Sequence, residues 1–180
     1  VPSNPDDLKG LLKAAIRDDD PVIVMESEQM YGDKGEVPEE EYTIPIGVAD
    51  IKRAGTDVTV VSFGKIIKVA LQAAEELAEE GISLEVIDLR TVRPIDYDTV
   101  IESVKKTNRL VCLEEAWPLG SIATEITYMV QKRAFDYLDA PVIRLTTADT
   151  PAAYAPTLME AFLPNKAQLI QAVKQVLYRN

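Results

Sequence analysis

Residues 57–115 decide the fold, and they read DVTVVSFG (57–64), KIIKVALQAAEELAEEG (65–81), ISLEVIDL (82–89), RTVRPIDYDTVIESVKKTN (90–108) and RLVCLEE (109–115). The first, third and last segments hold short runs rich in Val, Ile and Leu, which are typical of strands covered on both faces. We therefore expect strands over 58–63, 84–89 and 110–113. The second segment has apolar residues three and four positions apart and ends in Gly81, which predicts an amphipathic helix.

This alternation of strand and helix predicts parallel strands joined by right-handed crossovers. The stretch Ser3-Asn4-Pro5-Asp6-Asp7 predicts a helix that begins with a capping side chain and a proline in its first turn. The rest of the chain predicts a strand over 22–26, an antiparallel hairpin of 46–52 with 57–63, a helix from Ile122, a strand over 142–145, proline-broken turns over 151–164 and a last helix capped by Asn165. The predicted fold class is α/β, a three-layer domain with a mostly parallel sheet and one antiparallel edge strand.

The composition is that of an ordinary globular protein, with 47% hydrophobic and 27% charged residues among 180. Lys and Arg number 19 and Asp and Glu number 30, giving a formal net charge of −11. This balance disfavours nucleic acid as a partner and favours a basic protein surface. The sequence has no run of eighteen apolar residues and no signal-peptide pattern, so we expect no membrane partner and a cytoplasmic location.

Histidine is absent and cysteine occurs once. These counts exclude Ser-His-Asp and Cys-His nucleophile systems and the usual zinc sites, and leave carboxylates, Lys, Tyr or an organic cofactor for any chemistry. Cys112 lies inside an apolar strand and is predicted to be a small buried hydrophobe. The sequence begins Val1-Pro2 without Met, in what looks like the tail of a strand, and this indicates a cut chain.

The first predicted helix runs into an acidic turn at residues 18–20. Because a helix presents unpaired carbonyls and partial negative charge at its carboxyl end, three acids there need a positive neighbour. Two interpretations stay open. The turn is either a solvated acidic segment, or it holds a hard cation through the carbonyls of Ala15 and Ile16 together with Asp18 and Asp20.

Polar residues also follow the predicted strands. Arg90 and Arg93 are suited to clamp a carboxylate or phosphate, or else to hold the neighbouring aspartates, which are Asp88, Asp96 and Asp98. Glu114 and Glu115 are candidates for acid-base catalysis, but adjacent residues of a strand point to opposite faces, so their carboxylates are not expected to converge. None of these groups is sufficient for a reaction alone.

Several strings occur together in one order: AAIRDDDPVIVMESEQMYG (14–32), IPIG (44–47), TVVSFG (59–64), DLRTVRPID (88–96), LEEAWP (113–118), FDYLDAP (135–141) and RLTTADTP (144–151). Through them the chain resembles, over essentially all of its length, the carboxyl-terminal half of the beta subunits of thiamine-diphosphate-dependent 2-oxo acid dehydrogenases, and of pyruvate dehydrogenase in particular. The resemblance implies a transketolase-type carboxyl-terminal domain over 44–180, a linker over 32–43, and residues 1–31 as a remnant helix and strand of the pyrimidine-binding amino-terminal domain.

The same resemblance implies two sites and several partners. Members hold potassium on a loop similar to AIRDxx, which corresponds to Ala15, Ile16, Asp18 and Asp20. The peripheral subunit-binding domain of dihydrolipoyl acyltransferase, which is small and basic, docks near the acid that matches Asp139 and near the chain end at Asn180. An alpha subunit and a second beta subunit complete a heterotetramer. Thiamine diphosphate and magnesium are implied for the intact enzyme, but not for this piece, since the glutamate that touches thiamine lies in the other domain.

The implied activity of the intact bacterial enzyme is thiamine-dependent decarboxylation of pyruvate with reductive acetylation of a lipoyl group. This piece alone is expected to be inactive and to serve subunit assembly and docking of the acyltransferase. The alternatives are a beta subunit of the branched-chain 2-oxo acid enzyme, or an acidic interaction domain with no part in catalysis. A third is the tail of a transketolase or deoxyxylulose phosphate synthase, against which the AIRDDDP and FDYLDAP strings argue.

Overall fold

The structure is a computed structural model and describes residues 1–179. Its elements, in chain order, are α1 (Pro5–Arg17), η1 (Glu28–Met30), β1 (Asp50–Arg53), β2 (Val58–Ser62), η2 (Gly64–Ile66), α2 (Ile67–Glu79), β3 (Leu84–Asp88), α3 (Tyr97–Thr107), β4 (Leu110–Leu113), α4 (Ile122–Ala134), η3 (Phe135–Tyr137), β5 (Ile143–Leu145), α5 (Pro156–Phe162) and α6 (Lys166–Val176). Across this described part of the chain, no helix has the length and apolar character needed to span a bilayer.

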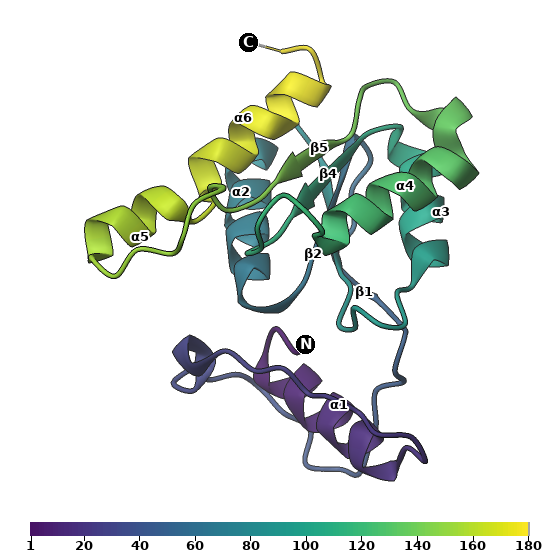
Figure 1. The fold of residues 1–180 in the computed structure, drawn as a ribbon. Helices are drawn as coiled ribbons and strands as arrows, with labels where there is room; N and C mark the ends of the chain where they lie inside the picture. The colour runs from purple at the N-terminus through teal and green to yellow at the C-terminus, as the bar shows by residue number, and fades with distance from the viewer. Residues whose placement is uncertain (180) are drawn as a thin grey trace.

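Within residues 1–179, five strands form one sheet in the order β1-β3-β2-β4-β5 (Figure 1). The central strand β2 pairs in parallel with β3 and β4, and β5 runs parallel to β4. At the opposite edge β1 runs antiparallel to β3. The expected mostly parallel sheet with one antiparallel edge strand is therefore confirmed.

Helices cover both faces of the sheet (Figure 1). α2 and α6 pack on one face in an apolar cluster that includes Val60 and Leu77, and α3 and α4 pack on the other in a cluster that includes Val61 and Ile126. Val60 and Val61 are adjacent and face opposite layers, which explains why β2 reads as a continuous apolar run. Each fully buried side chain of this size stabilises the fold by about 1.5–3 kcal/mol.

The predicted hairpin of residues 46–52 with 57–63 is wrong. β1 pairs with β3 instead, with Asp50 opposite Asp88 and Ile51 opposite Ile87. The chain between β1 and β2 crosses the start of β3 at Gly55, where an added Cβ would lie 2.1 Å from the carbonyl carbon of Leu84. Glycine at this position therefore permits a close crossing, whereas the sequence suggested a hairpin turn.

The predicted helix caps are confirmed at both ends of the chain. Asn4 Oδ1 accepts the N–H of Asp7 at 2.7 Å and starts α1. Asn165 and Gln168 form a reciprocal capping box at the start of α6, with both hydrogen bonds at 3.0 Å. Residues 151–164 were expected to form only turns, but they include the short helix α5.

Residues 1–45 lie beside the α/β unit, with α1 below the sheet in Figure 1. α1 packs against the returning segment 38–44, where the N–H of Ile44 donates to Gly10 O at 3.1 Å and Tyr42 Oη donates to Asp6 O at 3.0 Å. The predicted strand over 22–26 is wrong for the described residues. The segment has no assigned secondary structure, and none of the five strands pairs with it.

Candidate functional site

The acidic turn directly follows α1. Asp18 leaves the helix in an extended conformation, and its Oδ1 accepts the N–H of Asp20 at 3.0 Å. The carbonyls of Ala15 and Ile16 belong to the last helical turn, where carbonyls lack regular helical partners. Two carbonyls and two carboxylates suit a hard cation such as potassium. No cluster of three or more His, Cys, Asp or Glu residues within 1–179 is arranged to hold a metal, so the predicted site depends on its carbonyls.

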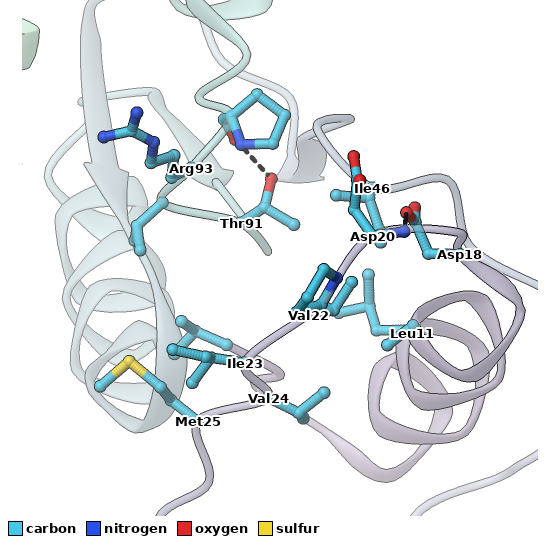
Figure 2. Close-up of a pocket in the computed structure, with 15 residues that line it drawn as sticks. Leu11, Asp18, Asp20, Val22, Ile23, Val24, Met25, Ile46, Thr91 and Arg93 are labelled. Carbon is cyan, nitrogen blue, oxygen red and sulfur yellow. Dashed lines mark hydrogen bonds between the residues drawn. The ribbon is translucent and has the colours of Figure 1, made fainter.

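This turn forms part of one wall of an open trough between α1 and the α/β unit. The trough encloses a cavity of about 580 Å³. In Figure 2, Asp18 and Asp20 lie near one end of it, and Thr91 and Arg93 lie across from Val22 and Ile23. Apolar residues of the segment 21–25 line much of the rest of the trough, and one of them, Ile23, is 87% exposed. Such an uncovered apolar surface is unusual for a soluble monomer and is typical of an interface.

The structure brings Asp139 close to the end of α6. Its carboxylate is exposed and pairs with the Arg109 guanidinium at 3.2 Å, while its carbonyl accepts the hydroxyl of Tyr178 at 3.1 Å. Arg109 Nε also donates to Val176 O at 3.1 Å. Asn180, the other predicted docking residue, lies outside the described residues. Asp139 therefore forms one surface with residues that immediately precede Asn180 in the sequence.

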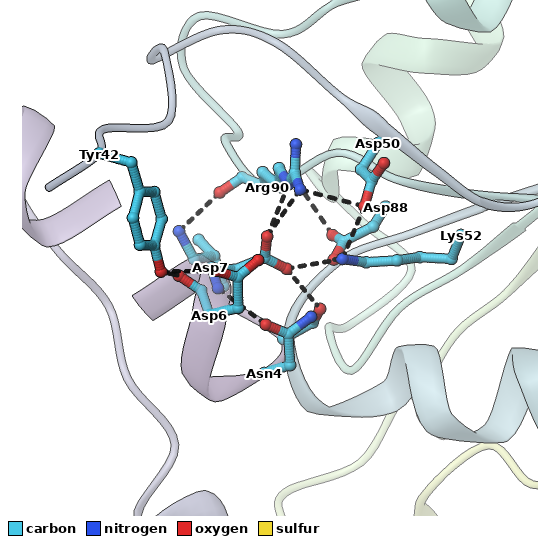
Figure 3. A network of polar contacts seen from close by, with 10 residues as sticks. Asn4, Asp6, Asp7, Tyr42, Asp50, Lys52, Asp88 and Arg90 are labelled. Carbon is cyan, nitrogen blue, oxygen red and sulfur yellow. Dashed lines mark hydrogen bonds and ion pairs between the residues drawn. The ribbon is translucent and has the colours of Figure 1, made fainter. Parts of the chain in front are cut away.

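A third site was not predicted. It is a joint cluster of five charged residues that connects α1 to the sheet and consists of Asp7, Asp50, Lys52, Asp88 and Arg90 (Figure 3). Lys52 Nζ lies 2.8 Å from both Asp7 Oδ2 and Asp50 Oδ2. The Arg90 guanidinium lies 2.8 Å from Asp7 Oδ1 and 3.1 Å from Asp50 Oδ2. Asp7 and Asp88 are fully buried, so these contacts form in a region of low dielectric.

The backbone of Arg90 adopts a left-handed conformation, with φ 57°. Its N–H donates to Asp88 Oδ1 at 3.0 Å, and its side chain reaches across to Asp7 and Asp50. A non-glycine residue keeps a left-handed backbone conformation only where its contacts hold it there. Here the carboxylates of Asp7 and Asp50 hold the side chain of Arg90.

The sequence interpretation of these arginines was partly wrong. Arg90 holds Asp88 only through its backbone, and it uses its guanidinium on α1 and β1. Asp96 instead caps α3 and accepts the N–H of Ala49 at 3.0 Å, and Asp98 pairs with Arg133. The joint cluster was missed because its members lie far apart in the sequence. One signal was present: Asp7 precedes the buried Leu11 by one helical turn, so an acid lies on the apolar face of α1.

The two glutamates after β4 diverge, as expected. Glu114 is buried, and its Oε1 accepts the N–H of Ala123 at the start of α4 at 3.1 Å. Glu115 points elsewhere and pairs with Lys65 at 3.0 Å. They therefore do not form an acid-base pair. Cys112 is buried as predicted, and burial raises the pKa of its thiol to about 12.

The fold and the sequence together define a class of protein. Residues 47–169 match the family described as "Transketolase, C-terminal domain", and the chain belongs to this family. A split-gene transketolase, described as an inactive beta4 tetramer, has the same fold, with a TM-score of 0.79 over 98% of this chain and 56% of that chain at 22% identity.

Other relatives are more similar to this chain in sequence than the split-gene transketolase is. The chain is 52% identical to the pyruvate dehydrogenase E1 component subunit beta of Rhizobium meliloti over 99% of its own length and 39% of the relative. It is 49% identical to the beta subunit of an acetoin:2,6-dichlorophenolindophenol oxidoreductase of Bacillus subtilis, over 98% of this chain and 52% of the relative. A mitochondrial pyruvate dehydrogenase E1 beta subunit of Dictyostelium discoideum is 48% identical, over 97% of this chain and 50% of the relative. The chain thus spans about half the length of these relatives or less.

Proposed function

We propose that this chain is the carboxyl-terminal part of the beta subunit of a pyruvate dehydrogenase decarboxylating component. The observation that carries the proposal is the 52% identity to such a subunit over 99% of the chain. The intact enzyme would decarboxylate pyruvate with thiamine diphosphate and magnesium and transfer an acetyl group to lipoyl groups. The role proposed for this part is assembly and docking, which the exposed apolar lining of the trough supports.

A division into three parts belongs to the same proposal. Residues 44–180 would be the transketolase-type domain, 32–43 the linker, and 1–31 a portion of the pyrimidine-binding domain. The uncovered segment 21–26 supports this division, because it is rich in β-branched residues and yet pairs with no strand of the described chain. A strand from the remainder of a longer beta subunit would give its backbone groups partners.

The proposed cation site would hold potassium on Ala15, Ile16, Asp18 and Asp20, where the ion would neutralise the acidic turn and fix the end of α1. The test compares thermal unfolding of the intact protein in potassium and in tetramethylammonium chloride at equal ionic strength. Potassium should raise the midpoint for the wild type and for Asp19→Ala, which is the matched control, and it should raise it much less for Asp20→Ala. Equal midpoints in both salts for the wild type would contradict the proposal.

The proposed docking surface includes Asp139 and the chain end at Asn180, and its partner would be the basic peripheral subunit-binding domain of dihydrolipoyl acyltransferase. The charge of −11 supports this choice, since opposite fields speed encounter and orient the partners. Calorimetric titration of the intact component with that domain tests it. Asp139→Lys should abolish the heat of binding, whereas Asp136→Lys, an equal change in charge three residues away, should weaken binding only slightly. Unchanged affinity in Asp139→Lys would favour a different surface.

A second candidate function comes from the acetoin oxidoreductase beta subunit, which is nearly as similar as the pyruvate dehydrogenase subunits. The intact beta subunit, assembled with its alpha subunit, should turn over pyruvate in preference to acetoin and to a branched-chain 2-oxo acid. Preference for acetoin would select the second candidate. Preference for the branched-chain acid would select the branched-chain enzyme.

The assembly proposed for the intact protein contains an alpha subunit and a second beta subunit. The component names of the relatives support an alpha partner, since each of those proteins is called a beta subunit. We also propose a cytoplasmic location in a bacterium. The relatives from Rhizobium and Rickettsia support it, although other relatives are mitochondrial.

A further inference from the structure

The five side chains of the joint cluster include one more acid than base. Its carboxylates belong to Asp7, Asp50 and Asp88, and its cations to Lys52 and Arg90 (Figure 3). Both cations form their short contacts with the same two acids, Asp7 and Asp50, at 2.8–3.1 Å. Asp88 is left with Lys52 Nζ at 3.9 Å from its Oδ2, which is too far for a hydrogen bond. The unmatched acid of the cluster is therefore Asp88.

The two oxygens of Asp88 differ in their surroundings. Oδ1 accepts the N–H of Arg90, whereas Oδ2 has no hydrogen-bond donor among the described residues. The neighbouring strand β2 places Ser62 in register with Asp88, and the Oγ of Ser62 likewise has no partner within residues 1–179. Both side chains are almost fully buried. A buried carboxylate oxygen without a donor strongly disfavours the ionised form, and protonation removes that penalty.

We propose that the joint cluster is a proton-binding site, in which Asp88 takes up a proton on Oδ2 and thereby tightens the attachment of α1 to the sheet. With the proton bound, two cations match two carboxylates. Without it, Asp88 competes with Asp7 for Lys52 and repels Asp7. Asp7 is the residue of α1 that makes the buried ion pairs to Lys52 of β1 and to Arg90 in the loop after β3. The competition for Lys52 therefore acts directly on the contact between α1 and the sheet.

The charges around Asp88 set the direction of the response. Burial raises the pKa of the Asp88 carboxyl, and the negative charge of Asp7 raises it further. The N–H of Arg90 and the charge of Lys52 oppose the rise, and so does the nearby hydroxyl of Ser3, whose own hydrogen bond goes to Asp7 Oδ2 at 3.2 Å. Asp50 faces the group from β1 through the Lys52 contact.

The amino group of Val1 also faces this region. It donates to Arg90 O at 2.8 Å, and burial lowers its pKa while Asp88 and Asp7 raise it. While it is protonated, this amino group is a third cation beside the three carboxylates and would balance their charge, so the test has to include a form of the protein without it.

A raised pKa in the folded state gives a stabilisation that is complete below the ordinary Asp value of about 3.9 and is lost as the pH rises through the folded value. The contribution of Asp88 to the attachment of α1 should therefore be greatest at and below a pH of about 4 and should decrease as the pH rises through the folded pKa. Between the ordinary Asp value and the folded pKa of Asp88, exchange protection of the α1 amides should fall by up to about tenfold per pH unit. Above the folded pKa it should not change further.

The experiment follows the Asp88 side-chain carboxyl by carbon-13 NMR in the complete 180-residue chain, and the α1 amides by hydrogen exchange corrected for intrinsic rates. Asp88 should titrate above the ordinary range, and the pH-dependent loss of α1 protection should have the same midpoint. Asp88→Asn should remove that dependence. Asp136→Asn, a change at an exposed aspartate of η3, should retain it, and so should a chain with an acetylated amino terminus.

An Asp88 titration at or below about 3.9 would overturn the proposal, and this result needs no variant. A raised titration combined with α1 protection that does not change across it would also overturn the proposal, because the proton would then have no effect on the attachment. The direct titration of the wild type keeps the test decisive if Asp88→Asn fails to fold.

Discussion

Replacing Asp7 by alanine should detach α1 from the sheet while leaving the α/β unit folded. Asp7 is 0% exposed and accepts Lys52 Nζ and Arg90 Nε, both at 2.8 Å. Removing one partner of a buried ion pair destabilises a protein by about 3–5 kcal/mol, because the remaining charges stay buried without compensation. Lys52 and Arg90 retain Asp50 and have side chains 14% and 15% exposed, so we expect the lower end, about 3 kcal/mol.

Hydrogen exchange of the α1 amides measures this loss locally, and urea unfolding followed by circular dichroism measures it globally. A change of about 3 kcal/mol corresponds to a loss of exchange protection of roughly 100-fold in α1. The amides of β2 and β4 should keep most of their protection, because their packing residues lie in other clusters.

The matched control is Asp98→Ala. Asp98 also forms an ion pair, with Arg133, but its side chain is 81% exposed. Exposed pairs contribute about 0–1 kcal/mol, so this variant should leave α1 protection unchanged. If Asp7→Ala keeps α1 protection within about threefold of the wild type, the joint cluster does not hold α1 to the sheet.

Three further substitutions or probes test the fold. Leu77→Ala, at a fully buried position of α2, should lower the free energy of unfolding in urea by about 2–5 kcal/mol, and a loss below 1 kcal/mol would contradict the assigned core. Gly55→Ala should lower it by about 1–3 kcal/mol because the new Cβ meets the backbone of Leu84 at 2.1 Å. The control Gly32→Ala, where nothing lies within 4 Å, should change it by less than about 0.5 kcal/mol. The Cys112 thiol, with its pKa raised to about 12, should react with a thiol reagent only after denaturation, and rapid labelling of the native protein would refute its burial.

The sequence predicted the sheet well because its strands are buried on both faces. β4 has the bounds expected from its apolar run, and β2 and β3 each end one residue earlier than expected. The position of β1 was not predictable in the same way. Proximity in the sequence and a glycine between two strands suggest a hairpin, but the reason for Gly55 is the backbone of Leu84, which only the folded chain brings there.

The candidate sites likewise differ in how far the sequence predicted them. The acidic turn and Asp139 were identified from sequence strings, and the structure adds their neighbours: the trough beside Asp18 and Asp20, and the end of α6 beside Asp139. The joint cluster was missed because an acid in the first turn of a helix has a sufficient local explanation in the helix dipole. Asp7 has a second role that depends on Arg90, 83 positions away, and no local pattern encodes that pairing.

In the proposed function, these residues serve assembly and docking, and the cofactor is bound elsewhere in a longer beta subunit with its alpha partner. The most direct test titrates thiamine diphosphate and magnesium into the 180-residue chain, and in parallel into the intact component, and measures turnover of pyruvate by each. We predict saturable binding and turnover for the intact component, and neither for the 180-residue chain. Saturable cofactor binding with pyruvate turnover by the 180 residues alone would contradict the proposed function.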